Sequence, residues 1–541
     1  MFTYFHSYLP ETWQAQVDRG LIGKNAGIRF SQSLLIDEPL KFNRLAAKDG
    51  PLWALEQEAR LPLYIDRLQG GCYFEGYDYD ESLLDAYRNL LDDGFFGFQM
   101  HEWMSNLWSD LCKLRGNGCP EWTADAIRAT IRRAFPFPHL FLEAMSAEEL
   151  AEAGPLASLE SFLAAAEALF ERRMRQCRGQ LIPCDSFALS HQLEVRLGAR
   201  RLMPEIGAQT PDTRVQIAYA RGMARAHRFD FGAYYEPWGG SPFSACCYQK
   251  DGRNEWGMQI GSKDFPFETC GENGGSSRSM QRRMHLYAYF AGAGFFSEEW
   301  GMCNLFADWR DFELTPYGRV KRDFLRLTER HPDRGALFAP IGIVLPREFP
   351  VLADIHCTED RLFGYPLAGS AAERFRRVRQ TVCALLSNPL PMLGTETTQL
   401  INSRIPDAFD LLHEDTPDAF SRYEYLIDLT DSGTLSKTHR CCTAADAPAL
   451  LEQLMPCTVS GNVHWFVNRT KNGWLLVLFN HSGICRTVAD GETALREADS
   501  PAAIRLKQGA LRRLEGDADL SEADGVYHLT LPAGGWFLGS F

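Results

Sequence analysis

The chain has 541 residues and a mass of 61.1 kDa, which at ~150 residues per domain suggests about three or four domains. Hydrophobic residues make up 45%, aromatic residues 12% and charged residues 23%, values that are typical of globular proteins and exclude disordered, collagen-like and coiled-coil classes. The formal net charge of −14 disfavours a nucleic-acid partner, because phosphate binding needs clustered Lys and Arg.

The N-terminal segment MFTYFHSYLPETWQAQ has neither a basic start nor an apolar stretch, and no run of the chain approaches ~20 apolar residues. We therefore expect a cytoplasmic protein that does not bind a membrane. The 15 cysteines are odd in number and no CxxC motif has a partner motif, so neither a disulfide framework nor a structural zinc site is indicated. We expect no metal and no cofactor.

Up to about Arg334, short apolar runs alternate with amphipathic helical patterns, which is typical of consecutive β-α units and a parallel sheet. The runs expected to be strands are Thr3–His6, Gly27–Ser31, Pro62–Arg67, Phe95–His101, Leu181–Asp185, Arg201–Glu205, Phe229–Glu236 and Gly294–Glu298. They predict a closed (β/α)8 barrel, the TIM barrel, over residues 1–334, with a helical insertion at 103–178. The first run is short, and an alternative count replaces it with Pro138–Leu142.

Two further domains follow the predicted barrel. Residues 335–456 show the pattern of a smaller α/β domain, with strands and helices expected at Ile341–Leu345, Ala371–Leu386, Phe409–His413, Tyr425–Leu429 and Ala447–Leu454. From 457 to 541 the pattern changes to alternating strands and turns. The asparagine-glycine turn at Asn472 and Gly473 is a strong hairpin signal, and we expect a β-sandwich here.

In a (β/α)8 barrel the reactive side chains lie at the carboxyl ends of the strands, and here those ends are acidic. They supply Asp66, Arg67, Gln99, His101, Glu102, Asp185, Glu205, Glu236, Glu298 and Glu299. Aromatic residues accompany several of them, namely Trp103, Tyr234, Tyr235, Trp238 and Trp300. Carboxylates ringed by aromatic faces suit a sugar, because rings stack on its C–H surface while acids bind its hydroxyls. Of the neighbours Glu298 and Glu299, only one is expected to face the pocket, since side chains alternate along a strand.

The segments YYEPWGG, NEWG and SSRSMQRRMHLYAYFAGAGFFSEEWG resemble the seventh and eighth barrel strands of the family 42 β-galactosidases of glycosidase clan A. The order of the three expected domains is similar too, and we interpret the chain as a related but distinct family. The resemblance implies that the middle domain is flavodoxin-like and forms an oligomer, with a trimer as the first candidate. The cysteine cluster that binds zinc in many family 42 members is absent.

The resemblance also assigns the two acids that cleave a glycosidic bond. The family's nucleophile, a glutamate at the end of the seventh strand, corresponds to Glu236. Clan A places its general acid/base at the end of the fourth strand, after an asparagine; that position is Glu102, and His101 replaces the asparagine.

We therefore expect a retaining, exo-acting β-glycosidase that hydrolyses the non-reducing-end sugar of oligosaccharides or glycosides. The carboxyl groups of Glu236 and Glu102 are predicted to lie ~5–5.5 Å apart, the separation that retention needs. The residues expected to bind substrate are Asp66, Arg67, Gln99, His101, Asp185, Glu205, Tyr235, Trp238, Glu298, Glu299 and Trp300.

Three alternatives stay open. The acid pair could be Glu205 with Glu236 or with Glu299, or Glu143 could be the acid if the alternative strand count holds. A barrel that only binds carbohydrate is the candidate from a different class. The sequence does not identify the sugar, because sugars differ in hydroxyl orientation that residue spacing does not reveal.

Overall fold

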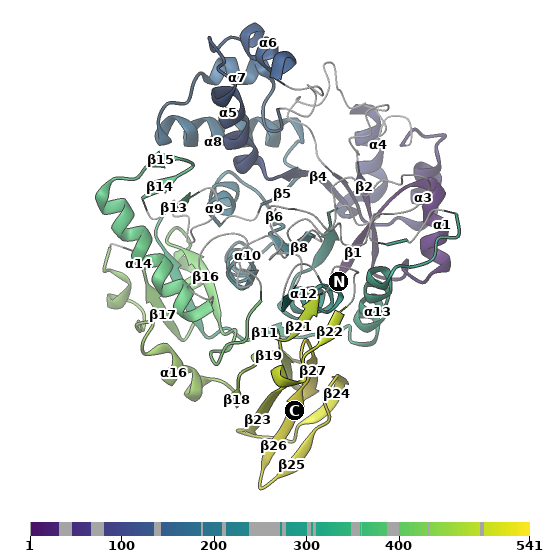
Figure 1. The fold of residues 1–541 in the computed structure, drawn as a ribbon, viewed down its shortest axis with the longest axis vertical. Coiled ribbons are helices and arrows are strands. Elements are labelled where there is room, and N and C mark those ends of the chain that lie inside the picture. Colours follow the sequence, from purple (N-terminus) through teal and green to yellow (C-terminus); the bar gives the residue numbers. More distant parts are fainter. Residues whose placement is uncertain are drawn as a thin grey trace.

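The structure is a computed structural model. It describes residues 2–31, 46–66, 81–134, 142–185, 188–207, 213–236, 271–272, 277–299, 305–306, 310–347, 357–358, 360–386, 400–430, 432–486 and 492–541. A barrel of parallel strands leads the chain, a small α/β unit follows, and antiparallel sheets end it (Figure 1).

The first part of the chain folds into a (β/α)8 barrel with strand order β5-β4-β3-β2-β1-β10-β8-β6 and with β7 beside β8. Its strands are β1 (Thr3–Ser7), β2 (Ala26–Ser31), β3 (Leu63–Asp66), β4 (Phe95–His101), β5 (Leu181–Cys184), β6 (Arg201–Leu202), β7 (Glu205–Gly207), β8 (Asp230–Glu236) and β10 (Phe295–Glu298). Strands β6 and β7 share the sixth position. Two backbone hydrogen bonds close the ring, from Met203 N to the Pro183 carbonyl at 3.0 Å and from Glu205 N to the Asp185 carbonyl at 2.9 Å.

The pairing of β1 decides between the two strand counts that the sequence allows. Strand β1 pairs with β2 on one side and with β10 on the other, so the expected count that includes it is confirmed and the alternative that drops it is wrong. Of the replacement strand Pro138–Leu142, all but Leu142 lies outside the described residues.

Alternating side chains fill the barrel, as the period of a strand requires. One buried cluster gathers inward-facing residues from around the ring, with the half-buried Phe96 packed against it: Phe5, Tyr64, Ile182, Cys184, Met203, Tyr234 and Phe295. Their neighbours along the strands pack outward against the helices. Residues that lie two or four positions beyond these toward the carboxyl ends therefore face the mouth of the barrel, except on β4, where the alternation is interrupted.

A glycine sets which residues of β4 face inward. Gly97 has φ +94°, and a Cβ there would lie 2.2 Å from the Gln180 carbonyl oxygen, so only glycine fits. The β3–β4 register shifts at this point, as in a β-bulge. After the shift, Gln99 and His101 share the inward face.

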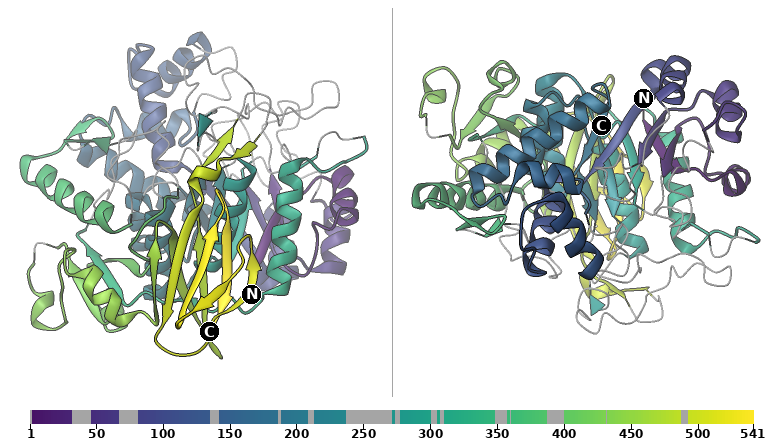
Figure 2. Two further views of the ribbon diagram at one scale, coloured as in Figure 1. Left: turned by 60° about the horizontal axis from the view of Figure 1, so that its bottom comes forward. Right: turned by 90° about the horizontal axis from the view of Figure 1, so that it is seen from above.

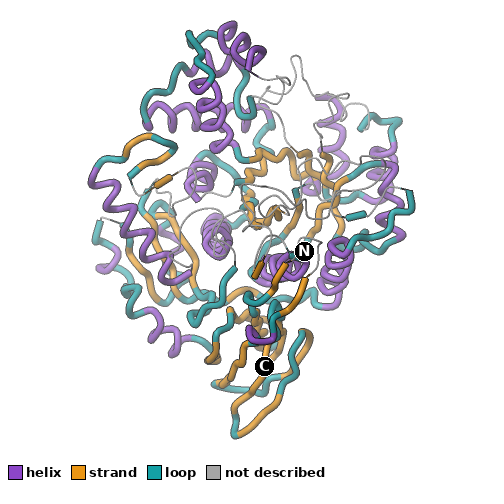
Figure 3. The backbone as a smooth tube through the Cα atoms, in the orientation of Figure 1, coloured by secondary structure: helices purple, strands orange, loops and turns teal. Residues whose placement is uncertain are grey.

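Helices surround the strands (Figure 3). Those of the barrel are α1 (Pro10–Asp18), α3 (Pro51–Ala59), α4 (Glu81–Leu91), α9 (Ala188–Arg196), α10 (Thr213–His227), α12 (Arg278–Phe290) and α13 (Pro316–Arg330). Between β4 and β5 lie four more: α5 (Trp103–Gly116), α6 (Ala124–Ala134), α7 (Ala147–Ala153) and α8 (Leu159–Gln176).

The α/β unit has a parallel sheet of three strands in the order β16-β12-β17, with the first strand in the middle as in a flavodoxin-like fold. Its elements are β12 (Ile341–Leu345), β13 (Cys357–Thr358), β14 (Arg361–Leu362), β15 (Tyr365–Pro366), α14 (Gly369–Leu386), β16 (Phe409–His413), α15 (Pro417–Phe420), β17 (Tyr425–Asp428) and α16 (Ala447–Leu454). The unit packs against α10 of the barrel, where Arg221 Nε lies 2.7 Å and Arg225 Nη1 lies 2.5 Å from the Asp410 carboxylate.

The C-terminal part is a β-sandwich of antiparallel sheets ordered β11-β19-β20-β27-β24 and β18-β23-β26-β25 (Figure 2). Its strands are β11 (Ala336–Leu337), β18 (Cys457–Gly461), β19 (His464–Thr470), β20 (Gly473–Phe479), β23 (Ser500–Leu506), β24 (Arg512–Gly516), β25 (Ser521–Ala523), β26 (Val526–Leu531) and β27 (Trp536–Ser540). The predicted hairpin joins β19 to β20, with Thr470 paired to Gly473.

A third small sheet links the sandwich to the barrel. In it β21 (Ile484–Arg486) pairs with β22 (Glu492–Ala494) and with β9 (Gly271–Glu272), which belongs to the segment between β8 and α12. The C-terminal part therefore touches the chain that follows Glu236.

Candidate functional site

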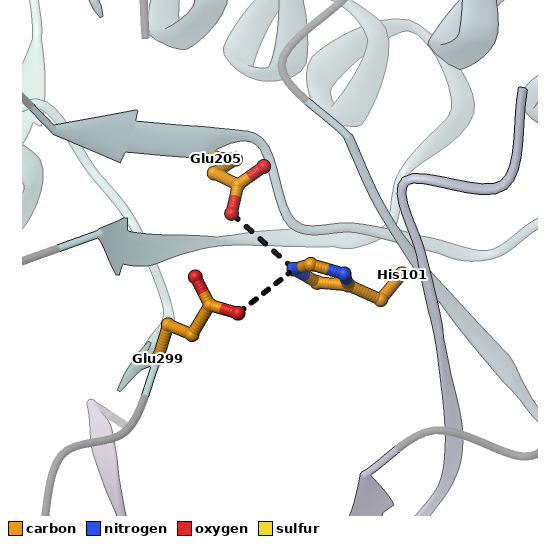
Figure 4. A group of neighbouring side chains, drawn as sticks. All are labelled: His101, Glu205 and Glu299. Atoms are coloured by element: carbon orange, nitrogen blue, oxygen red, sulfur yellow. Dashed lines mark hydrogen bonds and ion pairs between the residues drawn. The ribbon is translucent and has the colours of Figure 1, made fainter. Parts of the chain in front are cut away.

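The mouth of the barrel brings together a histidine and two glutamates from three strand positions. His101 is the last residue of β4, Glu205 the first of β7, and Glu299 follows β10. His101 Nε2 lies 3.3 Å from Glu205 Oε1 and 3.8 Å from Glu299 Oε1 (Figure 4). The three side chains are 6%, 1% and 9% exposed, so the cluster is nearly closed to bulk solvent.

Glu236 ends β8 on the inward face. Tyr234, two residues earlier, belongs to the interior cluster, so alternation directs the Glu236 side chain to the mouth. In the register of β7 and β8, Glu236 pairs with Gly207, and a Cβ on Gly207 would lie 2.9 Å from Glu236 Cβ and 2.4 Å from its carbonyl oxygen. The absent side chain of Gly207 therefore leaves space for Glu236.

Glu102 occupies the turn from β4 into α5. Its backbone has φ +43° and ψ +37°, a left-handed conformation that is costly for a residue other than glycine and that persists only where surrounding structure imposes it. Its N–H donates to the Cys184 carbonyl at 2.7 Å. Its carboxylate Oε2 lies 3.6 Å from His101 Nδ1, and its side chain is 37% exposed, so this acid is accessible where Glu205 and Glu299 are not.

Glu298 and Glu299 point to opposite sides of the barrel wall. The Glu298 carboxylate lies outside the ring, 2.5 Å from Lys321 Nζ and 2.8 Å from His285 Nε2, between α12 and α13. The ammonium group of Lys321 and the hydrogen bond from His285 outweigh burial and hold the pKa of Glu298 well below its usual range. Glu299 is therefore the member of the pair that faces the mouth.

Arg29 and Asp66 form an ion pair beside the cluster. Arg29 Nη2 lies 2.5 Å from Asp66 Oδ2 and donates to the Tyr234 hydroxyl at 2.8 Å. The Tyr234 ring in turn meets the His101 ring edge to face at 5.5 Å. The sequence interpretation did not include Arg29, although an arginine inside the apolar run GIRFS was a signal that could have found it.

Three other expected site residues have different surroundings. Gln99 is fully buried on the face of β4 that also carries His101. Asp185 is buried and accepts a hydrogen bond from Ser190 at 3.0 Å. Tyr235 is on the outer face of β8, where its ring lies 5.3 Å from that of His285, so the structure does not bring it to the mouth.

Of the remaining residues named from the sequence, Arg67, Trp238 and Trp300 lie outside the described residues. Trp103 is buried and donates from Nε1 to Glu194 at 2.7 Å, which is a packing position. Glu143, the acid of the alternative count, pairs with Lys113 at 3.1 Å, in the segment between β4 and β5.

The cluster of His101, Glu205 and Glu299 also offers the donors that a divalent cation accepts. One ligand atom from each residue lies within 4.8 Å of the others, and imidazole with two carboxylates suits several divalent ions. The observed His101 contacts of 3.3 and 3.8 Å equally fit an imidazole that is hydrogen-bonded or ion-paired to the two acids.

Comparison with known proteins identifies no family, since no family model and no curated protein matches this chain. Among solved structures, the catalytic module of a family 98 glycoside hydrolase from Streptococcus pneumoniae TIGR4 is 9% identical with a TM-score of 0.45, over 100% of this chain and 98% of that one. A β-galactosidase from Halorubrum lacusprofundi is 10% identical with a TM-score of 0.35, over 100% and 99%.

A rhamnosidase from Novosphingobium sp. PP1Y is 8% identical with a TM-score of 0.35, over 85% of this chain and 46% of that one. All three TM-scores are below 0.5, so nothing about the activity of this chain follows from them. None of the helices in the described part of the chain combines the length and hydropathy that crossing a bilayer requires.

Proposed function

We propose that the chain is a glycoside hydrolase whose active site is the mouth of the barrel. The observation that carries the proposal is the convergence of Glu205 and Glu299, from the sixth and eighth strand positions, on His101, with Glu102 beside it and Glu236 at the inward-facing end of the seventh. Glycosidic cleavage needs one carboxyl group to protonate the leaving oxygen and a second to attack carbon or to activate water.

Within this site, Glu236 is the proposed nucleophile and Glu102 the proposed acid/base. Glu236 lies on the inward face at the end of its strand. Glu102 is the exposed acid of the group, and an acid/base must reach both the leaving group and incoming water. Its left-handed backbone is the kind of local strain that gathers at functional sites.

The reaction then proceeds by two displacements. Glu236 forms a bond to the anomeric carbon as the glycosidic C–O bond breaks, and the Glu102 proton goes to the departing oxygen. Glu102, now a carboxylate, takes a proton from water, whose oxygen replaces Glu236 at the anomeric carbon, with retention. Exo-action on β-linked oligosaccharides or glycosides is proposed from the resemblance to family 42.

A second acid pair, Glu205 with Glu299, has an observation of its own. Their nearest carboxylate oxygens lie within 4.8 Å, close to the ~5–5.5 Å between the carboxyl groups of retaining enzymes. Their burial and their shared contact with His101 favour a supporting position instead. Glu205 with Glu236 is the remaining combination.

The test uses a panel of aryl glycosides with the wild-type chain, and the first product identifies retention or inversion. Glu236→Ala should abolish turnover, and azide should restore it as a glycosyl azide of inverted configuration, as expected when a small anion replaces the nucleophile. If Glu205→Ala shows this behaviour and Glu236→Ala does not, Glu236 is not the nucleophile. Binding of sugars without turnover by the wild type would favour a carbohydrate-binding barrel.

We also propose that the α/β unit, within residues 335–456, forms a homo-oligomer, with a trimer as first candidate. The support is the flavodoxin-like strand order together with the resemblance to the trimerising domain of family 42. Light scattering of the purified chain measures the mass directly, and a mass of 61.1 kDa, that of one chain, would contradict the proposal.

A further inference from the structure

The His101 ring is held from three sides. Glu205 and Glu299 lie at Nε2, 3.3 and 3.8 Å away, and the Tyr234 ring meets its face or edge at 5.5 Å. The remaining ring nitrogen, Nδ1, faces Glu102 Oε2 at 3.6 Å. The imidazole therefore stands between two buried acids and one accessible acid.

The backbone around Glu102 is fixed independently of its side chain. Glu102 N donates to Cys184, the Glu102 carbonyl accepts from Asn106 N at 2.7 Å, and Asn106 Nδ2 donates to the His101 carbonyl at 3.2 Å. Its accessible carboxylate extends to His101. The carboxylate approaches the ring at 3.6 Å, beyond hydrogen-bonding distance, so the ring limits the directions that the carboxylate can take.

The hydrogen-bonding chemistry follows from which atoms can donate. A glutamate oxygen within hydrogen-bonding distance of Nε2 can accept its proton, so Glu205 Oε1 at 3.3 Å favours the tautomer that carries a proton on Nε2, with Glu299 Oε1 beside it at 3.8 Å. Nδ1 and Glu102 Oε2 then make a favourable contact when one proton lies between them. Bonds of this kind are often long without substrate and shorten in the complex, which accommodates the 3.6 Å separation.

We infer that His101, anchored by Glu205 and Glu299, is a positioning residue that keeps a proton shared with Glu102 and aims it at the leaving oxygen. This inference rests on the proposed function. The proton passes from Glu102 to the departing oxygen while the electrons of the C–O bond go to that oxygen. The proton on Nε2 stays in place, so Glu205 and Glu299 act without contacting the reacting atoms.

Leaving-group dependence separates this function from a structural one. A phenyl glycoside needs a proton on its leaving oxygen, whereas a 2,4-dinitrophenyl glycoside of the same sugar leaves without one. For His101→Phe, which keeps a ring against Tyr234 but has no nitrogen, we expect kcat/KM to fall ~100-fold or more on the phenyl substrate and about threefold or less on the dinitrophenyl substrate.

Two further variants complete the experiment. His101→Ala should show the same pattern, and added imidazole should restore turnover of the phenyl glycoside. Glu194→Gln is the matched control, because Glu194 is also a buried acid bound to a histidine, His191, at 2.6 Å, but on α9. Glu194→Gln should leave the ratio of kcat/KM on the phenyl glycoside to kcat/KM on the dinitrophenyl glycoside unchanged.

Equal losses on both substrates, without rescue by imidazole, would overturn the inference while leaving the proposed function intact. An unchanged phenyl activity in His101→Phe would overturn it as well. If the wild type turns over neither substrate for any sugar of the panel, the proposed function fails and the inference fails with it.

Discussion

Glu298 and Glu299 show how two identical neighbours acquire different chemistry. Glu298 is fixed by a lysine and a histidine of the surrounding helices, while Glu299 lies over the mouth beside His101. Burial alone does not distinguish them, because both are nearly inaccessible. The groups that each carboxylate contacts distinguish the two glutamates.

For Glu298→Gln we expect a large loss of stability and no direct effect on the mouth. The substitution leaves the buried Lys321 ammonium without its 2.5 Å counter-ion, and breaking a buried pair in this way costs about 3–5 kcal/mol. Thermal and urea unfolding measure the loss. The control is Glu299→Gln, whose carboxylate lies 3.8 Å from the His101 imidazole; an equal loss there would contradict this account.

At the residue scale, the alternation of side chains along a strand predicts which residues can face the barrel interior, but not which groups they contact. The strand period correctly limits the inward-facing acids to one of the two neighbours, but Lys321 and His285, which decide between them, lie on other elements. For the same reason the strand ends point to His101, Glu205 and Glu299 individually, whereas their convergence at one ring nitrogen depends on the closure of the barrel.

At the scale of elements, α10 is a barrel helix covered on both sides. Every residue from Thr213 to Ala224 is buried, because β8 and β7 lie on one side and β16 of the α/β unit on the other. Its arginines therefore pair with acids of the α/β unit, Arg214 with Asp407 and Arg221 with Asp410. An amphipathic pattern in the sequence is local, whereas the acids that pair with these arginines lie about 190 positions further along the chain, so the pattern cannot identify them.

Gly222→Ala tests how closely α10 approaches β16. An added Cβ would lie 2.0 Å from the Leu411 carbonyl oxygen, which belongs to a strand and cannot move aside cheaply. We expect the unfolding free energy to fall by about 1–3 kcal/mol, the usual cost of overpacking. Gly116→Ala, at a helical glycine with open space around it, is the matched control and should be neutral or slightly stabilising in the same thermal melts.

At the scale of the whole molecule, one buried chain of polar groups joins all three parts. Arg283 of α12 donates to His481 Nδ1 at 2.6 Å, and His481 Nε2 lies 2.8 Å from His464 Nδ1. His464 Nε2 lies 2.8 Å from Asp407, which Arg214 of α10 also contacts. Because an arginine can only donate, each imidazole must pass its single proton toward Asp407, which fixes both tautomers.

These hydrogen-bonded buried groups make the packing of the three parts depend on pH. Burial lowers the pKa of both histidines, and the Arg283 guanidinium lowers that of His481 further. A base with a lowered folded pKa contributes its full stability above its unfolded pKa of about 6.5 and loses it as pH falls below that value. The nearby Asp407 and Asp410, whose pKa values are lowered by arginines, lose their contribution only below about 4.

Between pH 7.5 and pH 5.5 Asp407 and Asp410 stay ionised, whereas the buried carboxyl groups of Glu56 and Asp110, whose pKa values burial raises to about 8 and about 7, bind protons and stabilise the fold as the pH falls. The effect of the buried histidines is therefore a difference between variants. His481→Gln removes one of the groups that must stay neutral, so from pH 7.5 to pH 5.5 its thermal midpoint should fall less, or rise more, than that of the wild type, although it starts lower because a buried hydrogen bond is weakened. His528→Gln, at an exposed histidine of β26, should keep the wild-type difference. If the thermal midpoint of His481→Gln changes with pH as much as that of the wild type, protonation of these buried histidines does not weaken the packing of the barrel, the α/β unit and the sandwich.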